Sequence, residues 1–310
     1  MGIRHAVLGI GIAWLAACAA ADREEGDTRA DGAAPRAESA LLVSTAWLAE
    51  HLEDPGVVVL HVGSDRADYD RAHIPGARFL PLDAIVVERD GNINELPPVE
   101  RLDSVFESLG VSDDAHVVVY GPPLAAARAF FTLDYLGHGD RTALLDGGLE
   151  AWTAENRPLS TETPVAAPGN FTPRPRPELV VTAGWIQERL GNPHVALLDA
   201  RPEDQYSGAN PGAGVPRPGH IPGAVNIFWE RMIHSAAEPR LRDVESLRAL
   251  FREAGIEPGD TVVAYCRTGM QASYAYFVSR VLGYETRFYD GSFMDWSRRE
   301  DLPVSGPATR

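Results

Sequence analysis

The chain is 310 residues long, 45% of them hydrophobic, and carries a formal net charge of −16. This apolar fraction is typical of a globular protein with a sizeable core, and the length suffices for two domains of ordinary size. A strongly negative chain without a Lys/Arg block is unsuited to nucleic acid or an anionic membrane surface, because it cannot neutralise their phosphates. Any small anion must therefore be bound by a local site.

Residues 1–18 have the pattern of a lipoprotein-type signal peptide. A short basic start is followed by an apolar stretch that is too short to span a bilayer. The stretch ends in Leu15-Ala16-Ala17-Cys18, which resembles the bacterial lipoprotein box, in which the cysteine receives a lipid. An ordinary signal peptide with a chance cysteine is the alternative. We expect an exported bacterial cell-envelope protein that faces the periplasm and meets the membrane only through a lipid on Cys18.

The two halves of the chain repeat each other. Four short motifs recur in the same order at a separation of roughly 145 residues, which is too long for a solenoid and indicates a duplicated domain. In each half, Val/Leu/Ile-rich runs alternate with helical patterns, which favours an α/β fold with a mostly parallel sheet and helices on both faces. The paired motifs are Val57–Leu60 and Val195–Leu198, Ala72–Ala77 and Gly219–Ala224, Val117–Gly121 and Val262–Cys266, and Leu145–Trp152 and Tyr289–Trp296.

These patterns divide the chain into five segments. After the signal peptide, residues 19–40 are rich in Ala, Asp, Glu, Arg and Gly and predict a flexible tether. The two tandem domains are expected over 41–165 and 179–305. A Pro-rich stretch without periodicity over 166–178 is expected to join them.

Cys266 is the only cysteine besides Cys18. The apolar run that ends in Tyr265 predicts a buried strand, and the segment after Ser273 predicts a helix. At such a junction the N–H groups of the helix terminus, its dipole and the adjacent Arg267 favour negative charge. We therefore expect a nucleophilic thiolate at Cys266. A small buried residue at a strand end is the alternative.

The first half differs at this position. It has Gly121 followed by two prolines, which supply no nucleophile and cannot donate backbone N–H bonds. The first domain is therefore predicted to be inactive and to form one wall of the site. His73 and His220 occupy the same position in both halves, which favours a structural role for both.

The duplicated architecture, the paired His-Ile-Pro-Gly-Ala motifs, the loop after Cys266 and the closing Asp-Gly elements resemble the tandem-domain rhodanese family. These are thiosulfate and 3-mercaptopyruvate sulfurtransferases, and the resemblance extends from about Leu41 to Pro303. It implies two rhodanese-like domains, the second catalytic. It also implies that Cys266 takes sulfur from a small anionic donor as a persulfide and passes it to cyanide or a thiol. No cofactor is implied.

The family's active loop matches Cys266 to Gln271. Gly269 lets the loop curl tightly, and Arg267 suits the oxygens of an anionic donor. A cation directly after the cysteine resembles the thiosulfate enzymes, whereas Thr268 and Gln271 depart from them. The alternatives are 3-mercaptopyruvate as donor, or a persulfide carrier or sulfide-binding module without turnover. The loop residues implied to bind substrate are Arg267, Thr268, Gly269, Met270 and Gln271.

Three residues earlier in the second half are further candidates. Asp199 and Arg201 follow a strand whose carboxyl end should lie beside Cys266, where open α/β sheets bind their ligands. Arg201 is expected either to contact the donor or to form an ion pair with Asp199 that orients the loop. Arg217 lies in a Gly/Pro-rich insertion, Ser207 to Pro218, that could cover the site.

Spacing and missing motifs argue against three other chemistries. Cell-cycle tyrosine phosphatases with a related fold use Cys-(x)5-Arg, and Ala272 stands where that arginine is needed to stabilise developing charge. No Cys/His cluster has metal-ligand spacing, and no Walker-type phosphate loop is present. The sequence therefore implies neither a metal nor a nucleotide.

Overall fold

The computed structural model describes residues 40–306. The predicted signal peptide, Cys18 and most of the tether lie outside these residues. Between residues 40 and 306, no helix is long and apolar enough to cross a membrane.

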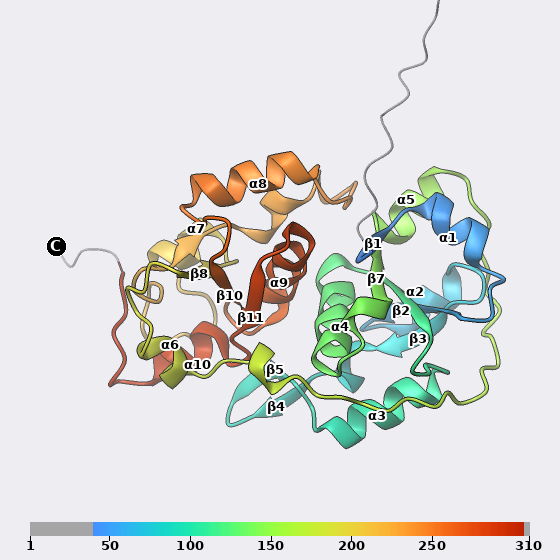
Figure 1. Ribbon diagram of the computed structural model, residues 1–310, viewed down its shortest axis with the longest axis horizontal. Coiled ribbons are helices and arrows are strands. Elements are labelled where there is room, and N and C mark those ends of the chain that lie inside the picture. Colours follow the sequence, from blue (N-terminus) through green and yellow to red (C-terminus); the bar gives the residue numbers. More distant parts are fainter. Residues whose placement is uncertain (1–39, 307–310) are drawn as a thin grey trace, which may run out of the picture. The chain divides into compact units, whose positions relative to one another are not determined.

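The first repeat is built on five parallel strands in the order β1-β7-β6-β2-β3 (Figure 1). Its strands are β1 (Leu42–Val43), β2 (Val57–Gly63), β3 (Arg78–Pro81), β6 (His116–Tyr120) and β7 (Thr142–Leu145). Its helices are α1 (Thr45–His51), α2 (Arg66–Arg71), α3 (Val99–Ser108), α4 (Pro123–Tyr135) and α5 (Gly148–Ala154), with 3₁₀ turns η1 (Leu82–Ala84) and η2 (Gly139–Arg141). A separate antiparallel hairpin consists of β4 (Val87–Arg89) and β5 (Asn92–Glu95).

The second repeat has a parallel sheet in the order β11-β10-β8-β9. A parallel bridge from Val180 to Phe288 extends it, as β1 extends the first sheet. Its strands are β8 (Val195–Asp199), β9 (Val225–Asn226), β10 (Thr261–Tyr265) and β11 (Glu285–Phe288). Its helical segments are η3 (Pro177–Leu179), α6 (Ala183–Gln187), α7 (Glu203–Ser207), η4 (Trp229–Met232), α8 (Val244–Glu253), α9 (Met270–Leu282) and α10 (Ser292–Arg298). The predicted α/β fold with two mostly parallel sheets is confirmed.

Strand β10 and helix α9 owe their limits to local sequence. The strand is buried from Val262 to Tyr265, as a continuous apolar run in a parallel sheet should be. Gly269 has a φ of +95° and begins the helix, and Gly283, with a φ of +87°, ends it. The helix therefore starts at Met270, earlier than the sequence predicts, because the glycine conformation closes the loop in three residues.

The largest hydrophobic cluster among the described residues spans both repeats, and each repeat also has a smaller cluster of its own. Helix α4 of the first packs against α9 of the second. The ring of Phe130 lies 5.0 Å from that of Phe277, and Phe131 stacks on Phe288 at 4.0 Å. Aromatic pairs at such distances contribute beyond their buried area. The repeats are therefore joined by core packing and not by the linker alone.

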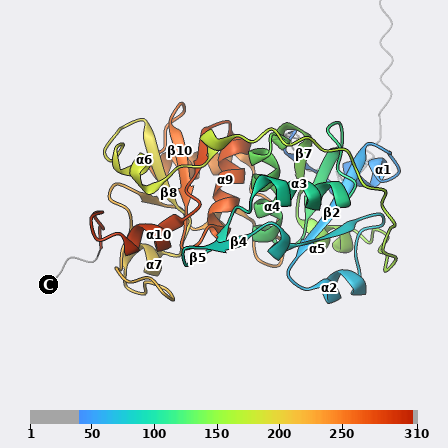
Figure 2. The same ribbon diagram turned by 90° about the horizontal axis from the view of Figure 1, so that it is seen from below.

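The β4–β5 hairpin belongs to the first repeat but contacts the second (Figure 2). The backbone N–H of Leu96, directly after β5, donates to Oδ2 of Asp290 at 2.7 Å. The side chain of Asn94 in β5 reaches Thr268 of the predicted active loop. The hairpin thus brings first-repeat residues to the carboxyl edge of the second sheet.

Candidate active site

Cys266 directly follows β10, at the carboxyl edge of the second sheet. The last strand residue, Tyr265, pairs in register with Asp199 of β8. The cysteine's backbone is held from the segment that opens α10: its N–H donates to Oγ of Ser292 at 3.3 Å, and its carbonyl accepts from the N–H of Phe293 at 2.9 Å. The residue is 2% exposed. Its sulfur therefore sits at a fixed position inside the fold.

The sulfur of Cys266 accepts a hydrogen bond from the active loop. The backbone N–H of Gly269 lies 3.1 Å from Sγ. Helix α9 begins at the next residue, Met270, so the positive end of its dipole also faces the loop. Donors aimed at one atom stabilise negative charge there without reorganising. The arrangement suits a thiolate or the anion of a persulfide.

Arg267 and Thr268 are both held by residues outside the loop. Nη1 of Arg267 donates to the carbonyl of Ala213 at 2.9 Å, so the insertion expected to cover the site does reach it. Thr268 is 7% exposed, and its Oγ1 accepts from Nδ2 of Asn94 at 3.3 Å. Met270 and Gln271 open α9 and are half-buried. The loop predicted from the sequence is therefore held in place by the insertion on one side and by the β4–β5 hairpin on the other.

Asp199 and Arg201 form a buried ion pair. Both side chains are fully buried, and Nε and Nη2 of Arg201 donate to the carboxylate at 2.6 to 3.1 Å. Burial lowers the pKa of Arg201, but the Asp199 carboxylate outweighs it, so the pKa is raised, with Cys266 contributing to the rise. Nη1 of Arg201 has no acceptor among the described residues. The expected ion pair is formed, the expected contact with a donor is not tested, and the Nη1 amino group keeps both of its N–H groups without an acceptor among the described residues.

The side chain of Arg217 is hydrogen-bonded to backbone carbonyls of its own repeat. Its guanidinium donates to the carbonyls of four residues at the end of α10 and just beyond it. These contacts anchor one end of the insertion. Its predicted contact with a donor is not tested by this arrangement, and no hydrogen bond joins it to the active loop among the described residues. The four acceptors are Trp296, Ser297, Arg299 and Leu302.

Sequence reasoning missed four residues that contact the loop: Asn94, Arg128, Asp290 and Ser292. Asn94 and Ser292 have φ of +65° and +52°, which non-glycine residues rarely adopt and which is often found at functional sites. The paired Asp-Gly motifs pointed to Asp290 and Ser292, but as repeat landmarks only. Nothing in the linear pattern connects Asn94 or Arg128 with a loop far along the chain.

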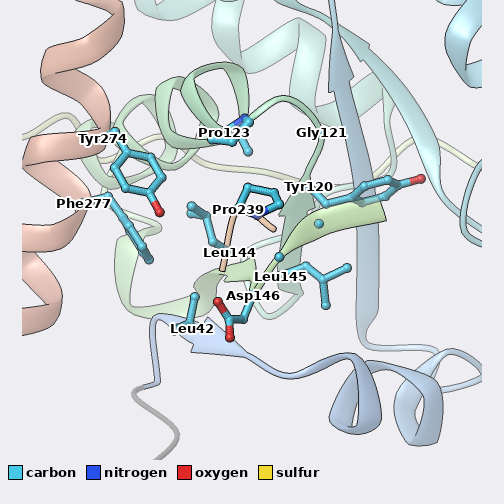
Figure 3. A pocket seen from close by; sticks show the side chains of 13 residues that line it. Leu42, Tyr120, Gly121, Pro123, Leu144, Leu145, Asp146, Pro239, Tyr274 and Phe277 are labelled. Atoms are coloured by element: carbon cyan, nitrogen blue, oxygen red, sulfur yellow. The ribbon is translucent and has the colours of Figure 1, made fainter. Parts of the chain in front are cut away.

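The corresponding place in the first repeat is lined in part by the second repeat (Figure 3). Pro239, from the second repeat, lies at the centre of the residues that line it, and Oδ1 of Asp146 accepts from the N–H of Leu241 at 2.8 Å. The remaining cavity of about 20 Å³ holds about one water molecule. A Cβ on Gly121 would overlap the carbonyl oxygen of Val62. This edge therefore offers no nucleophile, no space for a side chain at Gly121, and only a small cavity.

Residues 44–155 and 182–299 each match the model of the rhodanese-like domain. Sulfur carrier protein TtuD of Thermus thermophilus is 36% identical over 281 residues, covering 86% of this chain and 96% of its own. Thiosulfate sulfurtransferase of Azotobacter vinelandii is 33% identical over 267 residues, covering 85% and 96%. A probable 3-mercaptopyruvate sulfurtransferase of Pseudomonas aeruginosa is 34% identical over 285 residues, covering 86% and 98%.

Solved structures have the same fold. EanB in complex with ergothioneine aligns with a TM-score of 0.78 over 87% of this chain and 71% of that chain, at 24% identity. YnjE aligns with a TM-score of 0.72 over 86% and 68%, also at 24% identity. At this identity the likeness concerns the fold alone. Between residues 40 and 306, no group of three or more His, Cys, Asp or Glu side chains could hold a metal ion.

Proposed function

Because the chain belongs to the rhodanese-like domain family, we propose that it is a sulfurtransferase that carries sulfane sulfur on Cys266. The observation that carries the proposal is the hydrogen bond from the N–H of Gly269 to Sγ at a strand-to-helix junction. This loop provides a fixed nucleophile and a donor for its negative charge. The first repeat offers neither.

The reaction has two balanced steps. The Cys266 thiolate attacks the outer sulfur of thiosulfate, a new S–S bond forms, the S–S bond of thiosulfate breaks, and sulfite leaves with its electron pair. An acceptor such as cyanide then attacks the outer sulfur of the persulfide. Thiocyanate leaves and the thiolate is regenerated. Each step is a nucleophilic displacement at sulfur, so ping-pong kinetics are expected.

Thiosulfate is the donor that the loop favours. Arg267 is half-buried and follows the cysteine directly, and its contact with the Ala213 carbonyl can be exchanged for the stronger contact with an anionic oxygen. Arg201 adds a fixed positive charge close to the sulfur, and we assign its free Nη1 the second contact. A carboxylate donor such as 3-mercaptopyruvate could use the same two groups, and one relative is named for that activity.

A persulfide carrier without rapid turnover is the second candidate. One relative, 36% identical over most of both chains, is named a sulfur carrier protein. A carrier needs the same cysteine and loop, and differs in passing its sulfur to a protein thiol. The rate with a small acceptor separates the two functions.

The test uses soluble protein beginning at residue 19, mixed with thiosulfate and cyanide. We expect continuous thiocyanate formation by the wild type and none by Cys266→Ser, because the hydroxyl cannot form the persulfide. A parallel series with 3-mercaptopyruvate compares kcat/KM for the two donors. Undiminished turnover by Cys266→Ser would exclude the mechanism, and a persulfide that forms once without turnover would identify a carrier.

We also propose that the protein is exported and anchored by a lipid on Cys18. The support is the signal pattern of residues 1–18, which ends in Leu-Ala-Ala-Cys. Intact mass of the membrane-extracted protein tests it. A mass corresponding to cleavage before Cys18 plus a lipid is expected, and an unmodified Cys18 would contradict it.

A further inference from the structure

We propose that Arg128 of the first repeat is a positioning residue for the active loop of the second, so that the site is completed across the repeat boundary. This inference rests on the proposed sulfur transfer at Cys266. Arg128 does not bind the donor in this account. It is hydrogen-bonded to Asp290, in the segment that holds the backbone of Cys266, and it lies against Gly269 of the loop itself.

Arg128 is a buried cation with an incomplete set of partners. It lies in α4, its side chain is fully buried, and Nη1 donates to Oδ1 of Asp290 at 3.1 Å. Nε and Nη2 have no acceptor between residues 40 and 306. The guanidinium carbon lies 5.3 Å from the ring of Phe131 and 5.5 Å from that of Phe288. A charge that is buried with so few hydrogen-bond partners lowers the stability of the fold.

The contacts of Arg128 lead to both ends of the active loop. Its partner Asp290 stands two residues before Ser292, whose Oγ accepts from the N–H of Cys266. On the other side, a Cβ added to Gly269 would lie 3.4 Å from Nη1 of Arg128. Gly269 is the residue whose N–H binds the sulfur. Arg128 therefore lies against the residue that holds Sγ and is hydrogen-bonded to the segment that holds the cysteine backbone.

Asp290 is clamped twice from the first repeat. Its Oδ1 accepts from Arg128, and its Oδ2 accepts from the N–H of Leu96 at 2.7 Å. Two donors on one carboxylate fix its plane and position, and thereby the backbone that follows it. Reaction rates at a fixed nucleophile are sensitive to shifts of about 1 Å in such supports.

The first repeat contains a matched pair that serves as control. Asp146 occupies the place of Asp290, accepts from the N–H of Leu241, and has Arg240 at 3.5 Å. That pair also crosses the repeat boundary but borders the small pocket at Gly121. Arg240→Gln therefore removes cross-repeat ion pairs, with Asp146 and with Glu155, without touching the active loop.

The experiment measures persulfide formation by intact mass after rapid mixing of the soluble chain with thiosulfate alone. For Arg128→Gln, which keeps a hydrogen-bond donor but loses the charge and the fork, we expect the rate constant to fall about tenfold. The amplitude should remain that of one sulfur per chain, and the thiosulfate concentration giving half the maximal rate should change less than about twofold. Arg240→Gln should form the persulfide at the wild-type rate.

A merely structural role gives a different pattern. It would lower the amplitude in proportion to the folded fraction and leave the rate constant unchanged, and this outcome overturns the proposal. Equal losses in Arg128→Gln and Arg240→Gln overturn it as well. If Arg128→Gln does not fold, Arg128→Lys decides: it keeps the charge but not the planar fork, and an intermediate rate constant is expected. A wild-type rate in Arg128→Lys contradicts the proposal.

The reaction of Cys266 with iodoacetamide separates this inference from the proposed function. It requires no sulfur donor, and Arg128→Gln should slow it, because displacement of Gly269 removes the N–H that stabilises the reacting thiolate. Absence of persulfide in the wild type would remove the proposed function, while a slower alkylation in the variant would still support the role of Arg128. Alkylation at the wild-type rate in Arg128→Gln counts against that role whatever the function.

Discussion

Gly269 meets two structural requirements at the same time. Its φ of +95° is needed to turn the loop into α9, and its N–H must reach the sulfur of Cys266 at 3.1 Å. A side chain in this conformation costs about 1 to 2 kcal/mol. The loop can avoid that cost only by moving, and movement takes the N–H away from the sulfur.

We therefore expect Gly269→Ala to lower kcat/KM for thiosulfate by about tenfold or more, the scale on which loss of one oriented donor is felt. Gly283→Ala is the matched control, because Gly283 ends the same helix with a φ of +87° and has nothing within 4 Å of an added Cβ. It should lower stability to a similar degree and leave turnover unchanged. Steady-state rates and thermal melting of both variants give the comparison. Wild-type turnover by Gly269→Ala would show that the loop tolerates the change.

Contiguous residues of the site could be predicted, whereas residues brought in from afar could not. Cys266 to Gln271 form one run of sequence, so a strand pattern, a glycine and a helix pattern suffice to place them. Asn94 and Arg128 meet this run only through the hairpin and through the packing of α4 on α9. Those contacts depend on how two repeats associate, which no local pattern encodes. Asp199 and Arg201 could be placed beside Cys266, and the ion pair between them was one of the two roles expected for Arg201.

At the scale of elements, the apolar runs that recur in both halves of the sequence correctly predicted the strands of the two parallel sheets. Buried runs such as Val57–Leu60 and Val262–Tyr265 form central strands, because parallel strands are covered on both faces. The β4–β5 hairpin was not predicted. Its sequence is polar and lacks the alternation of apolar residues that indicates a strand. In addition, Asp90, Gly91 and Asn94 have positive φ, which interrupts the regular strand conformation.

Strand β2 carries a titratable group that links stability to pH. Burial, and to a lesser extent the electrostatic interaction with nearby His73, lowers the pKa of His61 from 6.5 to about 4, although Asp68 opposes this. The unfolded chain therefore takes up a proton as the pH falls below 6.5, while the folded chain does not until about pH 4. His61 thus lowers the free energy of unfolding as the pH falls through this window, by at most about 1.4 kcal/mol per pH unit.

His61→Leu should remove this dependence. We expect urea denaturation of the wild type to show a greater loss of stability between pH 7 and pH 5 than that of the variant, since leucine does not titrate. The ring lies in an aromatic group with Tyr69 and Tyr120, so the variant itself is less stable at pH 7. The difference between the two pH values, and not the absolute stability, is the measure. Equal differences would show that His61 does not titrate in this range.

At the scale of the whole molecule, Asp134 joins the two repeats. This fully buried carboxylate in α4 accepts from the hydroxyl of Tyr276 at 2.8 Å and from Arg280 at 2.9 Å, both in α9. Arg176, just before η3, donates to its other oxygen at 2.9 Å. Burial and this carboxylate raise the pKa of Tyr276 well above its ordinary value, so its hydroxyl stays a donor. One acceptor thus satisfies three donors from beyond the first repeat.

Asp134→Ala should lower the free energy of unfolding by about 3 to 5 kcal/mol, because it leaves these donors without an acceptor. Asp140→Ala is the control: it also removes an ion pair with Arg280, but the Asp140 side chain is 95% exposed and the separation is 3.7 Å. Its effect on stability should be small. Urea denaturation with probes in each repeat measures both. Coincident transitions of the two probes are expected for the wild type. If Asp134→Ala unfolds at the same urea concentration as Asp140→Ala, the hydrogen bonds of Asp134 do not stabilise the contact between the repeats.

Residues of each repeat cover the carboxyl edge of the other repeat's sheet. Leu96 and Arg128 of the first repeat bind Asp290. Leu241 and Arg240 of the second repeat bind Asp146. Only one of these two covers borders a nucleophile. The first repeat, which has no cysteine between residues 41 and 165, therefore supports the cysteine site of the second where the hairpin and α4 meet the loop. A substitution in the half without a cysteine can therefore be an active-site substitution, and natural or engineered variants of this chain should be sorted by distance from Cys266 and not by repeat.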